Sequence, residues 1–405
     1  MSTETFFTNL LAPQGAVKHL ILRRYLDAWV AILGQSNYKR LVYIDGFAGA
    51  GSYEGDQVGS PLVFLNSWIS HKLNARFPTM VVIFIEKNKE TRKKLKKEIE
   101  NYQIDPRLDV KIYKGGFAND LDTVLDELKD LLQGQPIFAF LDPFGYTQIP
   151  MSTIKRLFSI GKTEVLVNFM TKGLTRGIYI EVSSNIFPGS INHQGLQKKI
   201  NALFGNEDDR IQEVHKALKN ETDVSGRMEY LATSYEAALK DNTDAKFTLF
   251  FVMRGKRNEL IYHLVFATSH IKGIECMKEA MFKVDQTSEE SDELSFSDYD
   301  FLRSDTTTLI RPRDAEIWHK ISGDKINQEF SGLTADVEIV KQYVLTNTIF
   351  PWQSEIIKHA KPLLIETYDG LRRRGNLYGS KVNIQFAKLG ERYPDHAELV
   401  VAAKH

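Results

Sequence analysis

The chain has 405 residues, and its 52 basic and 52 acidic side chains leave no formal net charge. That length suffices for two domains, and the apolar fraction of 42% is typical of a soluble globular protein. The neutral balance excludes a globally basic nucleic-acid-binding protein, so any such binding requires a local basic patch. The single cysteine, Cys276, excludes an internal disulfide and a cysteine-based metal site within the chain.

Other sequence features predict where the protein is found. The chain has no signal-peptide pattern and no uninterrupted apolar stretch of about 18 residues. Together with the single cysteine, these features predict a cytoplasmic protein without membrane contact. The ten histidines are scattered and lack zinc-type spacing, so no metal site is predicted.

After an amphipathic helix over 16–33, short apolar runs alternate with helical patterns. The predicted strands are 41–45, 80–86, 108–113, 136–141 and 164–168, and the helices after the first four are 61–73, 89–101, 118–132 and 150–160. This alternation predicts a doubly wound, Rossmann-like α/β sheet of parallel strands. Apolar runs at 246–253 and 260–268 flank a basic turn and predict a β-hairpin, which gives the sheet an antiparallel edge.

The composition changes near residue 285. Residues 1–285 are expected to form the sheet domain, which ends with a helix over 273–282. A partly helical insertion at about 172–242 is expected at the carboxyl edge of the sheet, where a substrate would be gripped. An acidic, serine-rich stretch then predicts a linker over 286–310.

The C-terminal residues 311–405 are predicted to form a smaller domain. Helices expected at 336–345 and 353–364, a basic loop and a strand at 381–386 are compatible with a winged helix. In that case the basic loop is a wing that contacts nucleic-acid phosphates through Arg372, Arg373 and Arg374. The alternative is an exposed arginine run in a small α/β appendage.

The most informative stretch is LVYIDGFAGAGSYEGDQVGSPLVFL, residues 41–65. A buried strand ends at Asp45, a turn with Gly46, Phe47, Gly49 and Gly51 follows, and then a helix begins. Strand, glycine-rich turn and helix form a nucleotide-type cofactor site, because glycine lets the backbone pass close to a ligand. The spacing G-x-x-G-x-G differs from the dinucleotide fingerprint and looks like the first motif of S-adenosylmethionine (SAM) methyltransferases. The alternative is an ordinary tight turn between strand and helix.

The next predicted strand, MVVIFIE, also ends in a carboxylate, Glu86. In cofactor-binding α/β folds an acid at this position accepts hydrogen bonds from the ribose hydroxyls, so Glu86 is the predicted ribose ligand. The alternative is an exposed glutamate at the start of the following helix, where acids favour the positive end of the dipole. For the helix that follows the glycine-rich turn, Ser60 is predicted as the N-cap and Pro61 as a first-turn residue.

The fourth predicted strand leads into Asp142, Pro143, Phe144, Gly145 and Tyr146. Methyltransferases that act on amino groups of bases carry Asp or Asn, Pro, Pro and an aromatic residue at this point. The acid accepts hydrogen bonds from the target amine, the proline stiffens the turn, and the aromatic ring stacks on the base. Here the turn reads Asp-Pro-Phe-Gly, so Phe144 or Tyr146 supplies the stacking surface in a shifted register. The alternative is a structural turn with a buried phenylalanine.

Polar residues elsewhere could join this site. Asn168, at the end of the fifth predicted strand, points to the same edge and either orients the substrate or caps a turn. Lys18 and His19, near the start of the first helix, lie either beside the cofactor or in solvent, and the solvated position is the simpler expectation.

Several long segments resemble the three-Cys-motif partner protein family. They are YIDGFAGAGSYEG, GSPLVFL, FLDPFGYTQIPMSTIKRLF, VLVNFMTKGLTRG and YHLVFATSHIKGIECMKEAMFKVD, and together they span about residues 16 to 285. The tail FPWQSEIIKHAKPL is similar more weakly. The resemblance implies a SAM-methyltransferase-like fold and a separate cysteine-rich partner protein that carries the three cysteines. By position it assigns the SAM loop to Asp45, Gly49 and Gly51, the ribose acid to Glu86, and the active-site turn to residues 142–145.

The sequence therefore predicts a SAM-dependent methyltransferase that acts on an amine, with a base in RNA or DNA as the leading acceptor. Asp142, Pro143, Phe144, Tyr146 and Asn168 are its predicted catalytic residues. One alternative is a catalytically silent SAM-fold scaffold that binds nucleic acid or a cysteine-rich partner. Another is a nuclease-like or defence-associated component with Asp45, Glu86 and Asp142 as acidic ligands.

Overall fold

The computed structural model describes residues 13–53, 57–102, 104–115, 117–145, 147–184, 193–205, 208–221, 223–254, 259–287, 315–348, 350–360, 364–367 and 382–386. The chain divides into two compact units, Met1–Tyr299 and Asp300–His405. The division falls inside the stretch expected to be a linker, 286–310, of which the first two residues belong to helix α11 and the rest lie outside the described residues.

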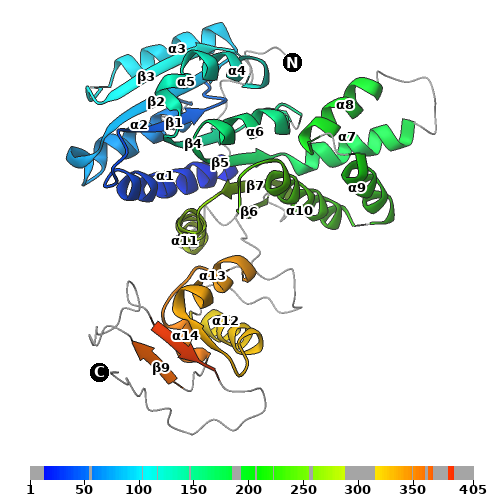
Figure 1. The fold of residues 1–405 in the computed structure, drawn as a ribbon. Coiled ribbons are helices and arrows are strands. Elements are labelled where there is room, and N and C mark those ends of the chain that lie inside the picture. The colour runs from blue at the N-terminus through cyan, green and yellow to red at the C-terminus, as the bar shows by residue number, and fades with distance from the viewer. Residues whose placement is uncertain are drawn as a thin grey trace. The chain divides into compact units, whose positions relative to one another are not determined.

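The first unit is built on a sheet of seven strands in the described part of the chain (Figure 1). The strands are β1 Arg40–Asp45, β2 Thr79–Glu86, β3 Leu108–Lys114, β4 Pro136–Leu141, β5 Lys162–Phe169, β6 Phe247–Arg254 and β7 Leu260–Thr268. Their order is β3-β2-β1-β4-β5-β7-β6, with β1 to β5 parallel and β7 antiparallel to both β5 and β6. The predicted Rossmann-like sheet with an antiparallel edge hairpin is confirmed.

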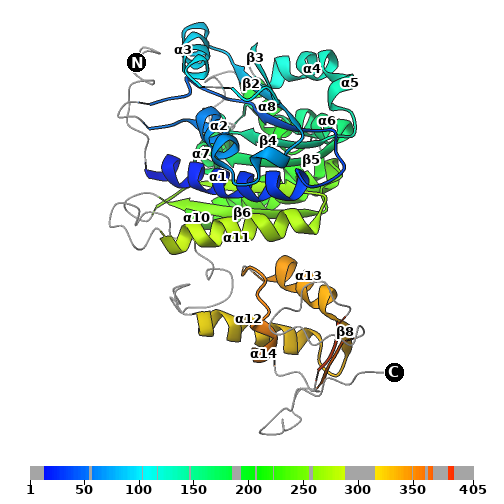
Figure 2. The same ribbon diagram turned by 90° about the vertical axis from the view of Figure 1, so that its left-hand side faces the viewer.

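One face of the sheet packs against α1 Pro13–Leu33, α2 Ser60–Ser70 and α11 Ile271–Thr287, and α1 lies beside α11 (Figure 2). Aromatic rings fill this layer. The Tyr25 ring of α1 lies 5.1 Å from both Phe138 of β4 and Phe266 of β7. Tyr43 of β1 stacks on Phe64 of α2 at 4.2 Å. The contacts of Tyr25 fix the middle of α1 against the sheet.

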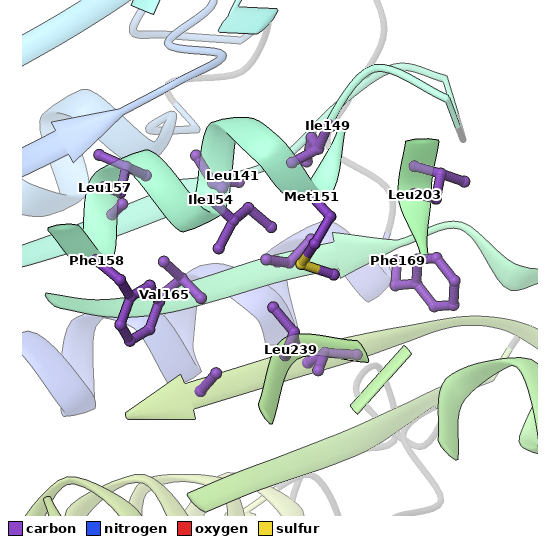
Figure 3. Packing of buried hydrophobic residues seen from close by; sticks show 14 of the residues in the cluster. Leu141, Ile149, Met151, Ile154, Leu157, Phe158, Val165, Phe169, Leu203 and Leu239 are labelled. Atoms are coloured by element: carbon purple, nitrogen blue, oxygen red, sulfur yellow. The ribbon is translucent and has the colours of Figure 1, made fainter. Parts of the chain in front are cut away.

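The opposite face packs against α4 Phe117–Glu127, α5 Lys129–Leu132 and α6 Met151–Ile160. Met151, Ile154 and Leu157 of α6 point into a buried apolar cluster with strands β4 and β5 (Figure 3). The connection from β2 to β3 runs through α3 Lys89–Glu100, and a 3-10 turn, η3 Asn74–Arg76, precedes β2.

The predicted insertion contains four helices among the described residues: α7 Thr171–Ser184, α8 His193–Leu203, α9 Asp208–Asn220 and α10 Val224–Asn242. Leu203 of α8 and Leu239 of α10 belong to the same apolar cluster as α6 (Figure 3). The insertion is therefore packed onto the sheet core and extends from the carboxyl end of β5.

The second unit has the element order α12 Ala315–Glu329, β8 Thr334–Asp336, α13 Val337–Asn347, α14 Ile356–His359, β9 Leu364–Thr367 and β10 Val382–Gln385. Its three strands form an antiparallel sheet in the order β8-β10-β9. Trp318 stacks on Phe350 at 5.3 Å, and Phe330 stacks on Phe386 at 5.5 Å. The predicted helix over 353–364 is wrong: it shrinks to α14, because Pro362 cannot continue a helix and a strand begins at Leu364.

Candidate functional site

Four polar side chains meet at one edge of the sheet. Glu86 and Asp45 are the last residues of β2 and β1, Asp142 directly follows β4, and Asn168 is next to last in β5. Since β2, β1, β4 and β5 are neighbours and parallel, their carboxyl ends lie side by side. Ligand sites of open α/β sheets lie at this edge.

The glycine loop after β1 is fastened to the strands on both sides. The Gly46 N–H donates to the Phe140 carbonyl at 3.0 Å, and the Ala48 N–H donates to the Ile85 carbonyl at 3.0 Å. Gly49 and Gly51 have φ of 66° and 85°, the left-handed region that favours glycine. A Cβ on Gly51 would lie 3.0 Å from Leu95, whereas a Cβ on Gly49 would meet nothing within 4 Å. The loop therefore leaves open space in front of Gly49.

Asp45 is fully buried at the start of this loop. Its Oδ1 accepts from the Phe47 N–H at 3.1 Å, and its Oδ2 has no hydrogen-bond partner among the described residues. Burial raises the pKa of Asp45 to about 7, although the nearby Ser60 hydroxyl and the Phe47 N–H both act to lower it. Ser60 is the first residue of α2 and not its N-cap, which is Gly59, so the predicted capping role is wrong.

Glu86 ties the first two strand ends together. Its Oε2 accepts from the Gly49 N–H at 3.0 Å, and its Oε1 accepts from the Asn88 N–H at 2.6 Å. The side chain is buried, which differs from the alternative of an exposed helix-start glutamate; Asn88 caps α3 instead. Each carboxylate oxygen has further lone pairs that can accept a hydrogen bond from a ligand.

Asp142 forms the centre of a three-residue cluster. Its Oδ2 pairs with the Lys18 Nζ of α1, and its Oδ1 accepts from the Asn168 Nδ2 at 2.7 Å. Burial alone would raise the pKa of Asp142, but the Lys18 charge and these two hydrogen bonds outweigh it and hold the pKa below its usual value. The side chain of Asp142 remains about a fifth exposed. Asp142 is therefore an ionised carboxylate at an accessible point of the edge.

The simpler expectation of solvated Lys18 and His19 is wrong. Both are buried, at 7% and 6% exposure. The signal was present in the sequence: Lys18 lies one and two helical turns before the buried Leu22 and Tyr25, on the same face of the helix. Burial and the neighbouring Lys18 charge lower the pKa of His19 to about 4. From the sequence alone, a position beside the cofactor was only the less simple of two possibilities for these residues.

The structure describes Pro143 and Phe144 of the predicted active-site turn but not Tyr146. Pro143 is buried, and the Phe144 side chain is 66% exposed, so the alternative of a buried phenylalanine is wrong. Tyr146 lies outside the described residues, as do Arg372, Arg373 and Arg374. Phe47 packs against the apolar cluster on the α6 side of the sheet, which makes it a support of the loop.

Within the described ranges, no group of three or more His, Cys, Asp or Glu side chains is arranged to hold a metal ion. No described helix is long and apolar enough to cross a membrane.

No protein-family profile and no curated protein sequence matches the chain. Several solved structures do. The methyltransferase domain of bacterial CtHen1-C is 10% identical, with 62% of this chain and 100% of that one covered and a TM-score of 0.29. Fibrillarin from Aeropyrum pernix, with natively bound SAM, is 10% identical over 61% of this chain and 76% of its own, with a TM-score of 0.26. A geranyl diphosphate methyltransferase is 9% identical over 60% of this chain and 77% of its own, with a TM-score of 0.24. At such scores, the fold assignment rests on the strand order of this chain.

Proposed function

We propose that the protein binds SAM at the edge formed by β1, β2 and β4 and transfers its methyl group to an amine. The observation that carries the proposal is the arrangement of Asp45, Glu86 and Asp142 on three adjacent strand ends around the open space at Gly49. When bound, SAM supplies an electrophilic methyl group, whose bond to sulfur breaks with the electron pair left on sulfur. The residues present fit such a cofactor, because Asp45 Oδ2 is a buried oxygen without a partner among the described residues and a cationic amino group would satisfy it.

Each residue has a separate task in this proposal. Glu86 accepts hydrogen bonds from the ribose hydroxyls and from the Gly49 N–H. It therefore both holds the glycine loop in its open conformation and orients the cofactor. Asp142 accepts from the target amine, and Asn168 and Lys18 fix its carboxylate in one orientation. The exposed Phe144 ring offers a stacking face for an aromatic acceptor. A base in RNA or DNA is the leading acceptor, since an exocyclic amine and a flat ring match these two features.

The proposed family is that of the three-Cys-motif partner proteins, on the strength of the long segments quoted above. In that case a separate cysteine-rich protein binds this chain in the cytoplasm. Cys276 is half-buried, and burial raises the pKa of its thiol to about 11, so it is poorly suited to act as a reactive or metal-binding thiolate.

Gly49→Val is expected to abolish SAM binding. The new side chain would enter the open space, and a β-branched residue at φ 66° costs about 1–3 kcal/mol of strain. Gly134→Val is the matched control, because Gly134 has φ 72°, equally free surroundings and a place far from the site. At SAM concentrations of roughly 100 times Kd, thermal unfolding should show a gain of about 2.7 kcal/mol for wild type and Gly134→Val and none for Gly49→Val. Equal responses of the two variants would place SAM elsewhere.

We propose a nucleic-acid-binding role for the second unit. Its order of helix, strand, two helices and two strands supports the winged-helix proposal, in which the loop between β9 and β10 is the wing. This loop contains Arg372, Arg373 and Arg374.

Replacing the three arginines by glutamine should weaken binding to duplex DNA or RNA and reduce its salt dependence. The logarithmic slope should fall by about 0.9 for each DNA phosphate that the variant no longer neutralises. A variant with Lys94, Lys96 and Lys97 of α3 changed to glutamine removes the same charge from an exposed face and should keep the slope. Fluorescence anisotropy across a salt series measures both. If the two variants show the same reduction in slope, the arginines act only through net charge and the wing proposal is wrong.

One observation favours a second candidate function, a catalytically silent SAM-fold scaffold. Both oxygens of Asp142 already have partners, Lys18 and Asn168, so the turn also suits a purely structural role. The two functions differ in one outcome: the scaffold binds SAM without methyl transfer.

A further inference from the structure

His19 is a buried base that the proposed site does not yet use. Its side chain is more than nine-tenths buried, and its Nδ1 has no hydrogen-bond partner among the described residues. The ring lies close enough to the Lys18–Asp142 pair for both charges to shift its pKa. The loop after β1 is also near the ring: Ser52 pairs with Val58 in this loop, and the Tyr53 ring lies 6.4 Å from the imidazole. His19 thus lies near both the loop after β1 and the Lys18–Asp142 pair.

The surroundings fix its protonation state. A hydrogen bond with the Val58 backbone raises the pKa of His19, as an imidazole N–H donating to a carbonyl does. With Nδ1 unpartnered, the proton sits on Nε2 and a lone pair remains on Nδ1. Burial and the Lys18 charge lower the pKa of His19 to about 4, against an opposing effect of Asp142. The ring is therefore neutral at pH 7 and able to accept a proton.

We propose that His19 is the proton acceptor of the methyl-transfer site, an inference that rests on the proposed function. Attack on the methyl carbon gives the acceptor nitrogen a fourth bond and a positive charge. The N–H bond then breaks, its electron pair stays on nitrogen, and the proton moves to His19 Nδ1 to form an imidazolium. Asp142 stabilises that cation, and the proton passes to water when the product leaves.

The first test requires no turnover. Long-range proton–nitrogen NMR spectra of histidine-labelled protein, with S-adenosylhomocysteine added, report which ring nitrogen carries the proton, and His19→Asn assigns the signal. We expect an Nε2–H tautomer with unprotonated Nδ1 from neutral pH down to about pH 4. A proton on Nδ1 at neutral pH would remove the lone pair and overturn the inference.

The second test measures single-turnover methyl transfer to denatured total RNA and DNA. His19→Asn should slow transfer by about 10²-fold with SAM affinity within twofold of wild type, and imidazole should restore activity to His19→Ala. His71→Gln is the control: both ring nitrogens of His71 have backbone partners, at 3.1 Å each, and its rate should stay unchanged.

The outcomes separate the two proposals. An active wild type with an equally active His19→Asn overturns the role of His19 and leaves the proposed function intact. A slow variant without imidazole rescue assigns His19 a structural role, which also overturns the inference. A wild type that binds SAM but labels neither nucleic acid overturns nucleic-acid methylation, and the role of His19 falls with it.

Discussion

Asp142→Asn is expected to slow methyl transfer by about 10²–10³-fold while SAM affinity stays near that of wild type. Asparagine keeps the shape of the side chain and its contact with Asn168, but it removes the charge that accepts from the amine as positive charge develops. In the proposed site SAM is held mainly by the β1 and β2 ends, so its binding should change little. Calorimetry gives the affinity, and single-turnover transfer to total RNA and DNA gives the rate.

Stability must be separated from catalysis in this variant. Asp142→Asn leaves Lys18 buried without its counterion, and removal of one member of a buried pair costs about 3–5 kcal/mol. The double variant Asp142→Asn/Lys18→Met removes both charges and should regain most of that stability without regaining activity. Recovery of transfer in the double variant would show that Asp142 serves the fold and not the chemistry.

Asp45→Asn is expected to weaken SAM binding and to remove most of its pH dependence below pH 7. Burial raises the pKa of Asp45 to about 7, so the free protein holds a proton there that a cationic amino group must displace. Wild-type affinity should therefore rise by up to about tenfold per pH unit as the pH approaches 7, because one proton leaves on binding. Calorimetric titrations between pH 5.5 and pH 7.5, on the order of five points, measure the slope.

The same ionisation affects stability with a definite sign. The folded pKa of Asp45 lies above the unfolded value of 3.8, so its contribution is complete below pH 4 and is lost as the pH rises through 7. Glu164→Gln is the matched control, because Glu164 is a half-buried acid with a raised pKa near the amino end of β5, away from Asn168. It should change the pH dependence of unfolding and leave that of SAM binding intact. An unchanged SAM profile in Asp45→Asn would show that Asp45 does not meet the ligand.

The sheet was predictable because each strand can be recognised from its own apolar sequence pattern. Runs such as Leu41–Ile44 and Pro136–Leu141 are apolar on both faces, as central parallel strands must be, and each is followed by a helical pattern. Helix ends were less predictable. The stretch predicted as one helix over 118–132 divides into α4 and α5, since the break at Leu128 has no glycine or proline to mark it.

The acidic residues of the candidate site were predictable for the same reason. Acids at the ends of parallel strands lie at one edge of the sheet, independently of the loop conformations. The ion pair of Lys18 with Asp142 was not predictable, since the partners are 124 positions apart and meet only when α1 crosses the sheet. Charge in a helix is normally solvated, and only the position of Lys18 on the apolar face argues otherwise. The dual contacts of Glu86 depend in turn on the φ of Gly49, and the glycine spacing marks the turn without showing which backbone N–H reaches Glu86.

The central claim is methyl transfer to a nucleic-acid base at Asp142. The most direct test incubates wild-type protein and Asp142→Asn with methyl-labelled SAM and separate fractions of total RNA, total DNA and protein extract. We expect label in a nucleic-acid fraction, on an exocyclic amine after digestion to nucleosides, and loss of nearly all of it in the variant. Label in protein, or no label in any fraction despite measured SAM binding, would contradict the claim, and the second result would identify the protein as a SAM-fold scaffold.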